Sequence, residues 1–533
     1  MRPFSFVVTA IGAKAVLGKY TTENFTQPVL WQDLADVELI RVDDTYYYSA
    51  STMHFSPGAP LLKSMDLVNW EYLSHSLPEI KVGDPGYDLD GSNKYNEGVY
   101  ASSIAYHKKT GVFFWIGCLQ YIGATLVYTA TDPAGPWTRE AIIEGYCFYD
   151  NGILIEDDDT FYVAYSKWIP NGNEAKIEVA QLKSDFQVET TKTVFHTTPE
   201  LGYIEGARFY KIQGRYYIWL TNPGVGRGQI VLRSDDGPFG PYNDWHRVLE
   251  NSGAPLPGAG PPFQGGLIDT PAGDWWYMAF VDRWPGGRLP VLAPVYWEDG
   301  WPNVKFVAEN TWAETYQYPL PRVDVKQIEG VERFKTNNLG PQWEWNHNPD
   351  NSKWAAGDGL TLQTATVTDD FFMARNTLTH RILGPESYAT IELDLTSMKD
   401  GDSAGLVVFR YNAGWIGVTK SGMNTTLQMV DNITMKRIDE GWKTVNKGEI
   451  MKSINFFGKQ VWLRVLCDVN GSPNYSTFYY STDGKHFEKF GSVHETLDGE
   501  VYFLGTRYGV FNYATKEIGG KVTVKSFEIN LPE

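Results

Sequence analysis

Three acidic residues stand at the start of three separate apolar stretches of the sequence. Asp36 opens DVELIRV, Asp150 opens DNGILIE and Glu205 opens EGARFYKI. Carboxyl groups bind metal ions as hard oxygen ligands, and they transfer protons during the hydrolysis of glycosidic bonds. Both chemistries need two or more carboxyl groups close together. The fold must therefore bring together residues that lie more than a hundred positions apart.

Each of these stretches begins a unit that is repeated five times. Every unit has an apolar strand, a polar turn and an aromatic strand, which indicates a β-hairpin. The five units begin at Asp36, Tyr100, Asp150, Glu205 and Gln264. A third strand follows each hairpin and ends in a polar turn, as in SMDLVNW (64–70). A pitch of about 50 to 65 residues with three or four strands per unit predicts a five-bladed β-propeller.

The texture of the sequence changes near Pro321. Beyond it, short alternating strands such as SYATIELDL and WLRVLCDV follow one another without the aromatic hairpin. This pattern predicts a two-sheet β-sandwich or jelly roll. We therefore expect an all-β protein with a propeller over residues 19–322 and a sandwich over residues 323–533. Because no Pro/Gly-rich linker separates them, the two domains are expected to pack rigidly.

The repeat predicts where the acids meet. The first strand of each blade lines the channel of a propeller, so the five opening residues are expected to surround one point on the axis. Three carboxyl groups converging there repel one another, which indicates a functional site rather than three turn caps. Aromatic residues make up 15% of the chain and favour a sugar over a metal ion as the ligand. Candidate stacking faces are Trp31, Phe55, Tyr100, Trp168 and Tyr203.

These motifs resemble glycoside hydrolase family 43 over nearly the whole chain, in particular fungal arabinofuranosidases and β-xylosidases with a C-terminal β-sandwich. The matching segments are ADVE (35–38) before DDTYY (43–47), YDNG (149–152), EGA (205–207), QGG (264–266), GR (287–288) and WEDGW (297–301). The resemblance implies that Asp36 is the general base and Glu205 the general acid. Asp150 would raise the pKa of Glu205 and orient it. It also implies inversion, with base and acid about 6.5–9.5 Å apart.

The sequence departs from the family pattern where an ion is concerned. The family often has a histidine before Gln-Gly-Gly that helps to hold an ion in the channel, and here that position is Phe263. We therefore expect no metal and no cofactor for the chemistry. The segment 88–93 resembles a calcium loop but lacks the glycine at the sixth position and the closing glutamate, so a structural calcium is not supported.

Two further residues near the acids have open roles. Asp33 lies three residues before Asp36 and is the alternative general base. Arg288 is expected to pair with a carboxylate or to bind a sugar hydroxyl. The predicted substrate-binding residues are Arg288, Tyr100, Phe55, Trp168 and Gln264.

Charge and terminal segments limit the partners and the location. A net charge of −18 without a basic run argues against a nucleic-acid partner. No run of 18 apolar residues is present, so no membrane partner is expected. Residues 1–18 resemble a weak secretory leader, which predicts a secreted protein, and we expect a monomer. The three cysteines, Cys118, Cys147 and Cys467, allow at most one disulfide. Cys118 and Cys147 both lie in apolar sequence, which favours buried free thiols over a bridge.

The predicted function is an inverting, exo-acting α-L-arabinofuranosidase that removes arabinose from arabinoxylan, a plant cell-wall polysaccharide. The alternative is a β-1,4-xylosidase, since the two sugars differ little at the reacting centre. A reading from another class is a carbohydrate-binding propeller without catalysis, which the three acids argue against. The sandwich is expected to form part of the active-site rim rather than a separate sugar-binding module.

Overall fold

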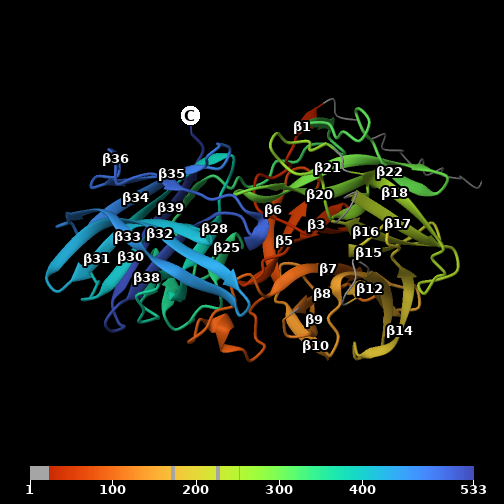
Figure 1. Ribbon diagram of the computed structural model, residues 1–533, viewed down its shortest axis with the longest axis horizontal. Helices are drawn as coiled ribbons and strands as arrows, with labels where there is room; N and C mark the ends of the chain where they lie inside the picture. The colour runs from red at the N-terminus through yellow and green to blue at the C-terminus, as the bar shows by residue number, and fades with distance from the viewer. Residues whose placement is uncertain (1–22, 120, 170–174, 224–227, 251–252, 533) are drawn as a thin grey trace, which may run out of the picture.

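The chain forms two β-domains that lie side by side (Figure 1). The computed structural model describes residues 23–119, 121–169, 175–223, 228–250 and 253–532. The predicted leader, residues 1–18, lies outside this range. Across the described residues the secondary structure consists of strands and three short 3₁₀ helices, η1 (Pro85–Asp88), η2 (Phe371–Met373) and η3 (Glu500–Tyr502). The all-β prediction is confirmed.

The first domain is the predicted five-bladed propeller, and each blade is a four-stranded antiparallel sheet. The strands of blades I and II are β2 (Glu38–Val42), β3 (Thr45–Ser49), β5 (Gly58–Ser64), β6 (Glu71–Leu77), β7 (Val99–His107), β8 (Val112–Leu119), β9 (Ala124–Ala130) and β10 (Thr138–Glu144). Those of blades III to V are β11 (Tyr149–Ile155), β12 (Phe161–Trp168), β13 (Ala175–Leu182), β14 (Val188–His196), β15 (Glu205–Ile212), β16 (Arg215–Asn222), β17 (Gly228–Ser234), β18 (Asp244–Glu250), β19 (Gly266–Asp269), β20 (Trp275–Arg283), β21 (Gly287–Glu298) and β22 (Trp301–Val304).

The aromatic hairpins hold the blades together. Tyr46 and Tyr48 of β3 are fully buried, and the Tyr48 hydroxyl donates a hydrogen bond to the carbonyl oxygen of Leu34. Burying one such ring stabilises the fold by roughly 1.5–3 kcal/mol. The ends of the propeller are tied by β1 (Asn24–Thr26), which pairs with β23 (Thr315–Gln317). The tyrosines that mark the repeat in the sequence therefore serve packing between blades.

The second domain is the predicted sandwich of two sheets. One sheet contains β24 (Gly330–Glu332), β26 (Trp354–Ala356), β27 (Leu360–Gln363), β29 (Glu386–Asp394), β34 (Gln460–Asp468), β35 (Tyr475–Ser481), β36 (Glu488–Lys489), β37 (His494–Glu495) and β39 (Lys521–Asn530). The other contains β4 (Phe55–Ser56), β25 (Trp343–Asn346), β28 (Leu378–Arg381), β30 (Asp402–Phe409), β31 (Asn412–Ser421), β32 (Asn424–Ile438), β33 (Gly441–Asn455) and β38 (Arg507–Ala514).

The propeller contributes a strand to the sandwich. Strand β4 lies in the connection between β3 and β5 of blade I and pairs with β25, so the propeller domain adds an edge strand to one sheet of the sandwich. Phe55 of β4 is only 1% exposed, and the guanidinium of Arg507 lies 3.6 Å from the centre of its ring. The prediction that Phe55 stacks on a sugar is therefore wrong, because its ring is buried in the interface between the two domains. Trp31 is likewise packed against Gly384 of the sandwich.

A disulfide corrects the cysteine prediction. Cys118 and Cys147 are bonded, with their Cα atoms 5.0 Å apart, whereas Cys467 is a buried free thiol. Cys118 lies on β8 of blade II and Cys147 immediately precedes β11 of blade III. Apolar surroundings alone suggested free thiols, but the adjacency of neighbouring blades brings these two residues together.

Candidate active site

A β-bulge shared by the blades sets the position of the acids. In blade III, Gly152 pairs with Ala164 and Tyr149 with Ser166, so three steps on the inner strand match two on its neighbour. Blade IV repeats this between Arg208 and Glu205. The same irregularity occurs in blade II at 99–102, in blade I at 35–38 and in blade V at 263–266.

The bulge corrects the predicted alignment of the acids by one residue. Asp36 and Asp150 are each the first unpaired residue of the bulge, and both have left-handed backbones, with φ of 59° and 49°. In blade IV this position is held by Gly206, with φ of 73°. Glu205 therefore corresponds to Tyr149 rather than to Asp150. Sequence spacing could not reveal this, because an extra residue in a strand leaves the hydrophobic pattern almost unchanged.

Asp36 is buried and held on both carboxylate oxygens. Ser51 Oγ donates to Oδ2 at 2.6 Å, and Arg288 Nη1 lies 3.0 Å from Oδ1. The structure thus decides between the two roles expected for Arg288 and pairs it with a carboxylate. These contacts fix the direction of the Asp36 carboxylate, which a general base requires.

Asp33, the alternative base, serves the domain junction. One of its carboxylate oxygens accepts from the backbone N–H of Arg288 and the other from that of Gly505 in the sandwich, both at 2.8 Å. Both oxygens are therefore committed to backbone groups. Asp36, unlike Asp33, is among the charges that raise the pKa values of Glu205 and Asp150, so it is the candidate general base that lies with the other acids.

Glu205 has the environment of a general acid. Burial, the largest cause, and the charge of Asp36 raise the pKa of Glu205 to about 7, against hydrogen bonds from Tyr203 and Tyr149 that favour the anion. The Tyr149 hydroxyl lies 3.4 Å from Oε2 of Glu205. A carboxylic acid that keeps its proton near neutral pH can donate it to a leaving group.

The protonation of Asp150 is linked to that of Glu205. Burial first, and then the charges of Glu205 and Asp36, raise the pKa of Asp150 well above its usual range. Because repulsion between Asp150 and Glu205 is mutual, the pair takes up a proton more readily than either carboxyl would alone. The backbone N–H of Gly206 donates to Asp150 and fixes its orientation.

Directly beneath the acids, a buried arginine crosses the channel. Arg208 Nη2 donates to the carbonyl oxygen of Asp36 at 2.9 Å, and Nη1 donates to that of Asn151 at 2.7 Å. Its Nε lies 2.9 Å from the carboxylate of Glu38, which also accepts from Ser103 Oγ. Sequence reasoning missed Arg208, although a cation inside the apolar stretch EGARFYKI is a signal that could have identified it.

The residues around the channel do not fit an ion. Phe263 packs against Phe280, with ring centres 5.8 Å apart, at the position where the family often has histidine. The guanidinium of Arg208 supplies the positive charge on the axis. Within the described ranges, no group of three or more His, Cys, Asp or Glu side chains is arranged to hold a metal. Asp88 of the calcium-like segment pairs with Arg375 at 3.1 Å.

The other predicted substrate-binding residues have different fates. Gln264 is buried against Gly206, and a side chain at position 206 would collide with Gln264. The Nε2 of Gln264 has no hydrogen-bond partner in the described part of the chain. Tyr100 donates to the carbonyl oxygen of Asn96 at 2.5 Å. Trp168 is 62% exposed at the end of β12, and no contact with the acids is recorded for it within the described residues.

The loop after η3 brings a sandwich residue to the site. Phe503 follows η3, and its ring centre lies 5.6 Å from the guanidinium of Arg288. Arg410 is buried beneath this loop and donates to the carbonyl oxygens of Leu497, Gly499 and Leu504. Sequence reasoning gave no sign of Phe503, because only the packing of the two domains brings residues 36 and 503 into one site.

A cavity of about 530 Å³ lies between the two domains. The propeller contributes Tyr95, Asn96, Glu97 and Tyr121, and the turn between β32 and β33 contributes residues 437–442. Tyr100 donates a hydrogen bond to Asn96 of this lining, and Arg288, which pairs with Asp36, is close enough for its charge to act on the Tyr100 hydroxyl. Both domains therefore shape the approach to the acids.

Comparisons with known families agree with this arrangement. The family described as "Glycosyl hydrolases family 43" matches residues 25–302, and "Beta xylosidase C-terminal Concanavalin A-like domain" matches residues 331–530. This chain belongs to glycoside hydrolase family 43. The family membership favours a glycoside hydrolase over the alternative hypothesis of a carbohydrate-binding propeller without catalysis.

Relatives of this family 43 hydrolase carry two kinds of name. A protein named "Beta-xylosidase" from Formosa agariphila is 30% identical over 97% of this chain and 92% of its own length. A "Non-reducing end alpha-L-arabinofuranosidase" from Bacteroides ovatus is 28% identical over 72% of this chain and 74% of its own.

A solved structure is more similar still. It is 38% identical, covers 96% of this chain and all of its own, and has a TM-score of 0.89. Its title describes a family 43 hydrolase engineered to display both endo-xylanase and exo-arabinofuranosidase activity. In the described part of this hydrolase, no helix is long and apolar enough to cross a bilayer.

Proposed function

We propose that this hydrolase is an inverting, exo-acting α-L-arabinofuranosidase that removes arabinose side chains from arabinoxylan. The observation that carries the proposal is the cavity of about 530 Å³ between the two domains, whose lining residue Asn96 accepts a hydrogen bond from Tyr100 at the start of blade II. Releasing a side chain requires the polysaccharide main chain to lie across the mouth of the site. A wide cavity between the domains gives the main chain that room. The similarity to a hydrolase with exo-arabinofuranosidase activity supports the same assignment.

The residues of the site suit a single displacement. Asp36, held by Ser51 and Arg288, accepts a proton from the water that attacks the anomeric carbon. As that bond forms, the glycosidic C–O bond breaks and Glu205 gives its proton to the leaving oxygen. Proton exchange with solvent then restores both carboxyl groups. Because water enters opposite the leaving group, the released sugar has the inverted anomeric configuration.

The second candidate is a β-1,4-xylosidase, which the name of the Formosa agariphila relative favours. NMR analysis of the products from arabinoxylan and from linear xylo-oligosaccharides separates the two. Inverted L-arabinose with an intact main chain supports the proposal. D-xylose released from chain ends identifies a xylosidase, and release of the retained anomer would refute the mechanism.

We also propose that the protein is a secreted monomer that acts on plant cell-wall polysaccharide. The leader-like residues 1–18 and the Cys118–Cys147 disulfide favour an oxidising compartment. A net charge of −18 favours a soluble monomer. N-terminal sequencing of protein from the culture medium and light scattering of the purified chain test these two statements.

A further inference from the structure

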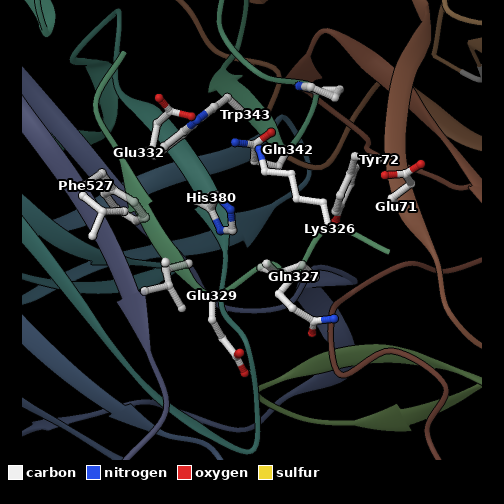
Figure 2. Close-up of a pocket in the computed structure, with 15 residues that line it drawn as sticks. Glu71, Tyr72, Lys326, Gln327, Glu329, Glu332, Gln342, Trp343, His380 and Phe527 are labelled. Atoms are coloured by element: carbon white, nitrogen blue, oxygen red, sulfur yellow. The ribbon is translucent and has the colours of Figure 1, made fainter. Parts of the chain in front are cut away.

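A smaller cavity, of about 140 Å³, lies on the outer side of blade I (Figure 2). It is lined by Glu71 and Tyr72 of β6, by the inter-domain connection 326–332 and by residues of the sandwich that include Trp343 and His380. Strand β6 is the outermost strand of blade I, three strand spacings from the inner strand next to Asp36. At about 4.8 Å per spacing, the cavity is roughly 14 Å or more from the acids.

His380 presents an uncommitted acceptor to this cavity. Its Nδ1 lies 2.7 Å from the carbonyl oxygen of Arg381, so Nδ1 carries the proton and Nε2 is the acceptor. Burial lowers the pKa of His380 to about 4, which keeps the ring neutral near neutral pH. No residue in the described ranges donates a hydrogen bond to Nε2. Figure 2 shows the ring near the middle of the cavity, with Trp343 and Glu332 above it and Gln327 below it.

Trp343 contributes a donor without a partner. Its side chain lines the cavity, and its Nε1–H is buried without a hydrogen-bond partner among the described residues. A buried donor that makes no hydrogen bond costs about 1–3 kcal/mol. Because the Nε1 of Trp343 is closed off from the cavity, the polar group that a ligand can satisfy is His380 Nε2, which would accept a hydrogen bond from a ligand hydroxyl beside the Trp343 ring.

The lining selects a neutral ligand rich in hydroxyl groups. Planar amides and carboxylates of Gln327, Gln342, Glu329 and Glu332 surround an apolar wall that includes Phe527. Lys326 is the one lysine in a lining with three glutamates, which disfavours phosphate. The volume is close to that of a cavity of about 150 Å³ that holds a single six-membered ring.

We propose that this cavity is a second binding site for a free pentose, the size and class of the sugar that the catalytic site releases. The pentose identity rests on the proposed function, whereas the preference for a neutral polyhydroxylated ring rests on the lining alone. A bound sugar would contact blade I, the connection and the sandwich together, and so would stabilise the junction of the two domains.

The test counts pentose-binding events on the full-length chain. L-Arabinose and D-xylose are titrated separately and followed by calorimetry and by saturation-transfer NMR. We expect two events in the unmodified protein, one at the catalytic site and one at this cavity. His380→Phe removes the acceptor and keeps an aromatic ring, and should weaken one event roughly two- to tenfold while kcat/KM on arabinoxylan is unchanged. Glu329→Ala, an exposed change that leaves folding intact, should weaken the same event.

A control variant and the hydrolysis products separate binding at this cavity from other effects. His486→Gln, at an exposed histidine of the sandwich, should leave both events unchanged. A single event that neither His380→Phe nor Glu329→Ala alters would mean that the cavity holds only water, and would overturn the proposal. Hydrolysis products decide the proposed function independently, because a xylosidase would still show the second event if the cavity binds pentoses.

Discussion

Arg208 offers the sharpest test of how the channel supports the acids. In Arg208→Met, Glu38 would keep its buried carboxyl and lose its cation, and the carbonyl oxygens of Asp36 and Asn151 would lose their donors. Removing one partner of a buried ion pair costs about 3–5 kcal/mol, a large part of the roughly 5–15 kcal/mol that stabilises a typical fold. We expect this loss in urea unfolding at pH 8.

The loss should depend on pH because Glu38 can take up a proton. Burial raises the pKa of Glu38 from 4.5 to about 7 even beside Arg208. A carboxyl whose folded pKa is raised favours folding most below its unfolded value, and this advantage disappears as the pH rises through about 7. That difference in pKa corresponds to roughly 3 kcal/mol of folding free energy. The penalty of Arg208→Met should therefore be smaller at pH 5, where Glu38 is protonated, than at pH 8.

Activity gives a second readout of the same change. Arg208 holds the backbone of Asp36, and a displacement of about 1 Å at a reacting group costs roughly 100-fold in rate. We expect kcat to fall by about that factor in Arg208→Met with a smaller change in KM. The double variant with Glu38→Gln should recover part of the stability at pH 8. An equal penalty at both pH values, together with an unchanged kcat, would refute this reasoning.

Three other predictions concern the acid, the rim and the disulfide. Glu205→Gln should lower kcat by roughly 10²- to 10⁴-fold. Tyr203→Phe removes a hydrogen bond that favours the Glu205 anion, so it should raise the pKa of Glu205 and move the alkaline limb of the kcat/KM profile above pH 7. An unshifted limb would show that Glu205 does not set it. Phe503→Ala should raise KM without changing the urea midpoint, since this ring is 43% exposed; a fall in the midpoint would make its role structural. Replacing Cys118 and Cys147 by serine should lower the free energy of unfolding by about 3.6 kcal/mol, given their separation of 29 residues. A reductant should lower the melting temperature of the unmodified protein in the same way, and no effect of the reductant would show that the bond is absent.

The local rules of strand and turn made much of the fold predictable. Hairpins repeat because aromatic strands and polar turns repeat, and five such units can bury their faces only by closing into a ring. The acids Asp36, Asp150 and Glu205 were recognisable because a charge at the mouth of an apolar strand conflicts with burial unless the fold uses it. The predictions for Phe55 and for the cysteines failed because both depended on which neighbours the folded chain supplies.

The sequence by itself determined the architecture and the chemical identity of the three acids, since hydrophobic period and charge are local properties of the chain. Tertiary structure alone decided that Glu205 is offset by one residue from Asp150, because a bulge changes the register without changing the pattern. It also decided that Arg208 spans the channel and that Phe503 of the sandwich reaches the site. Phe503 contacts Arg288, and Arg288 in turn pairs with Asp36; only the packing of blades and domains brings residues so far apart in the sequence together.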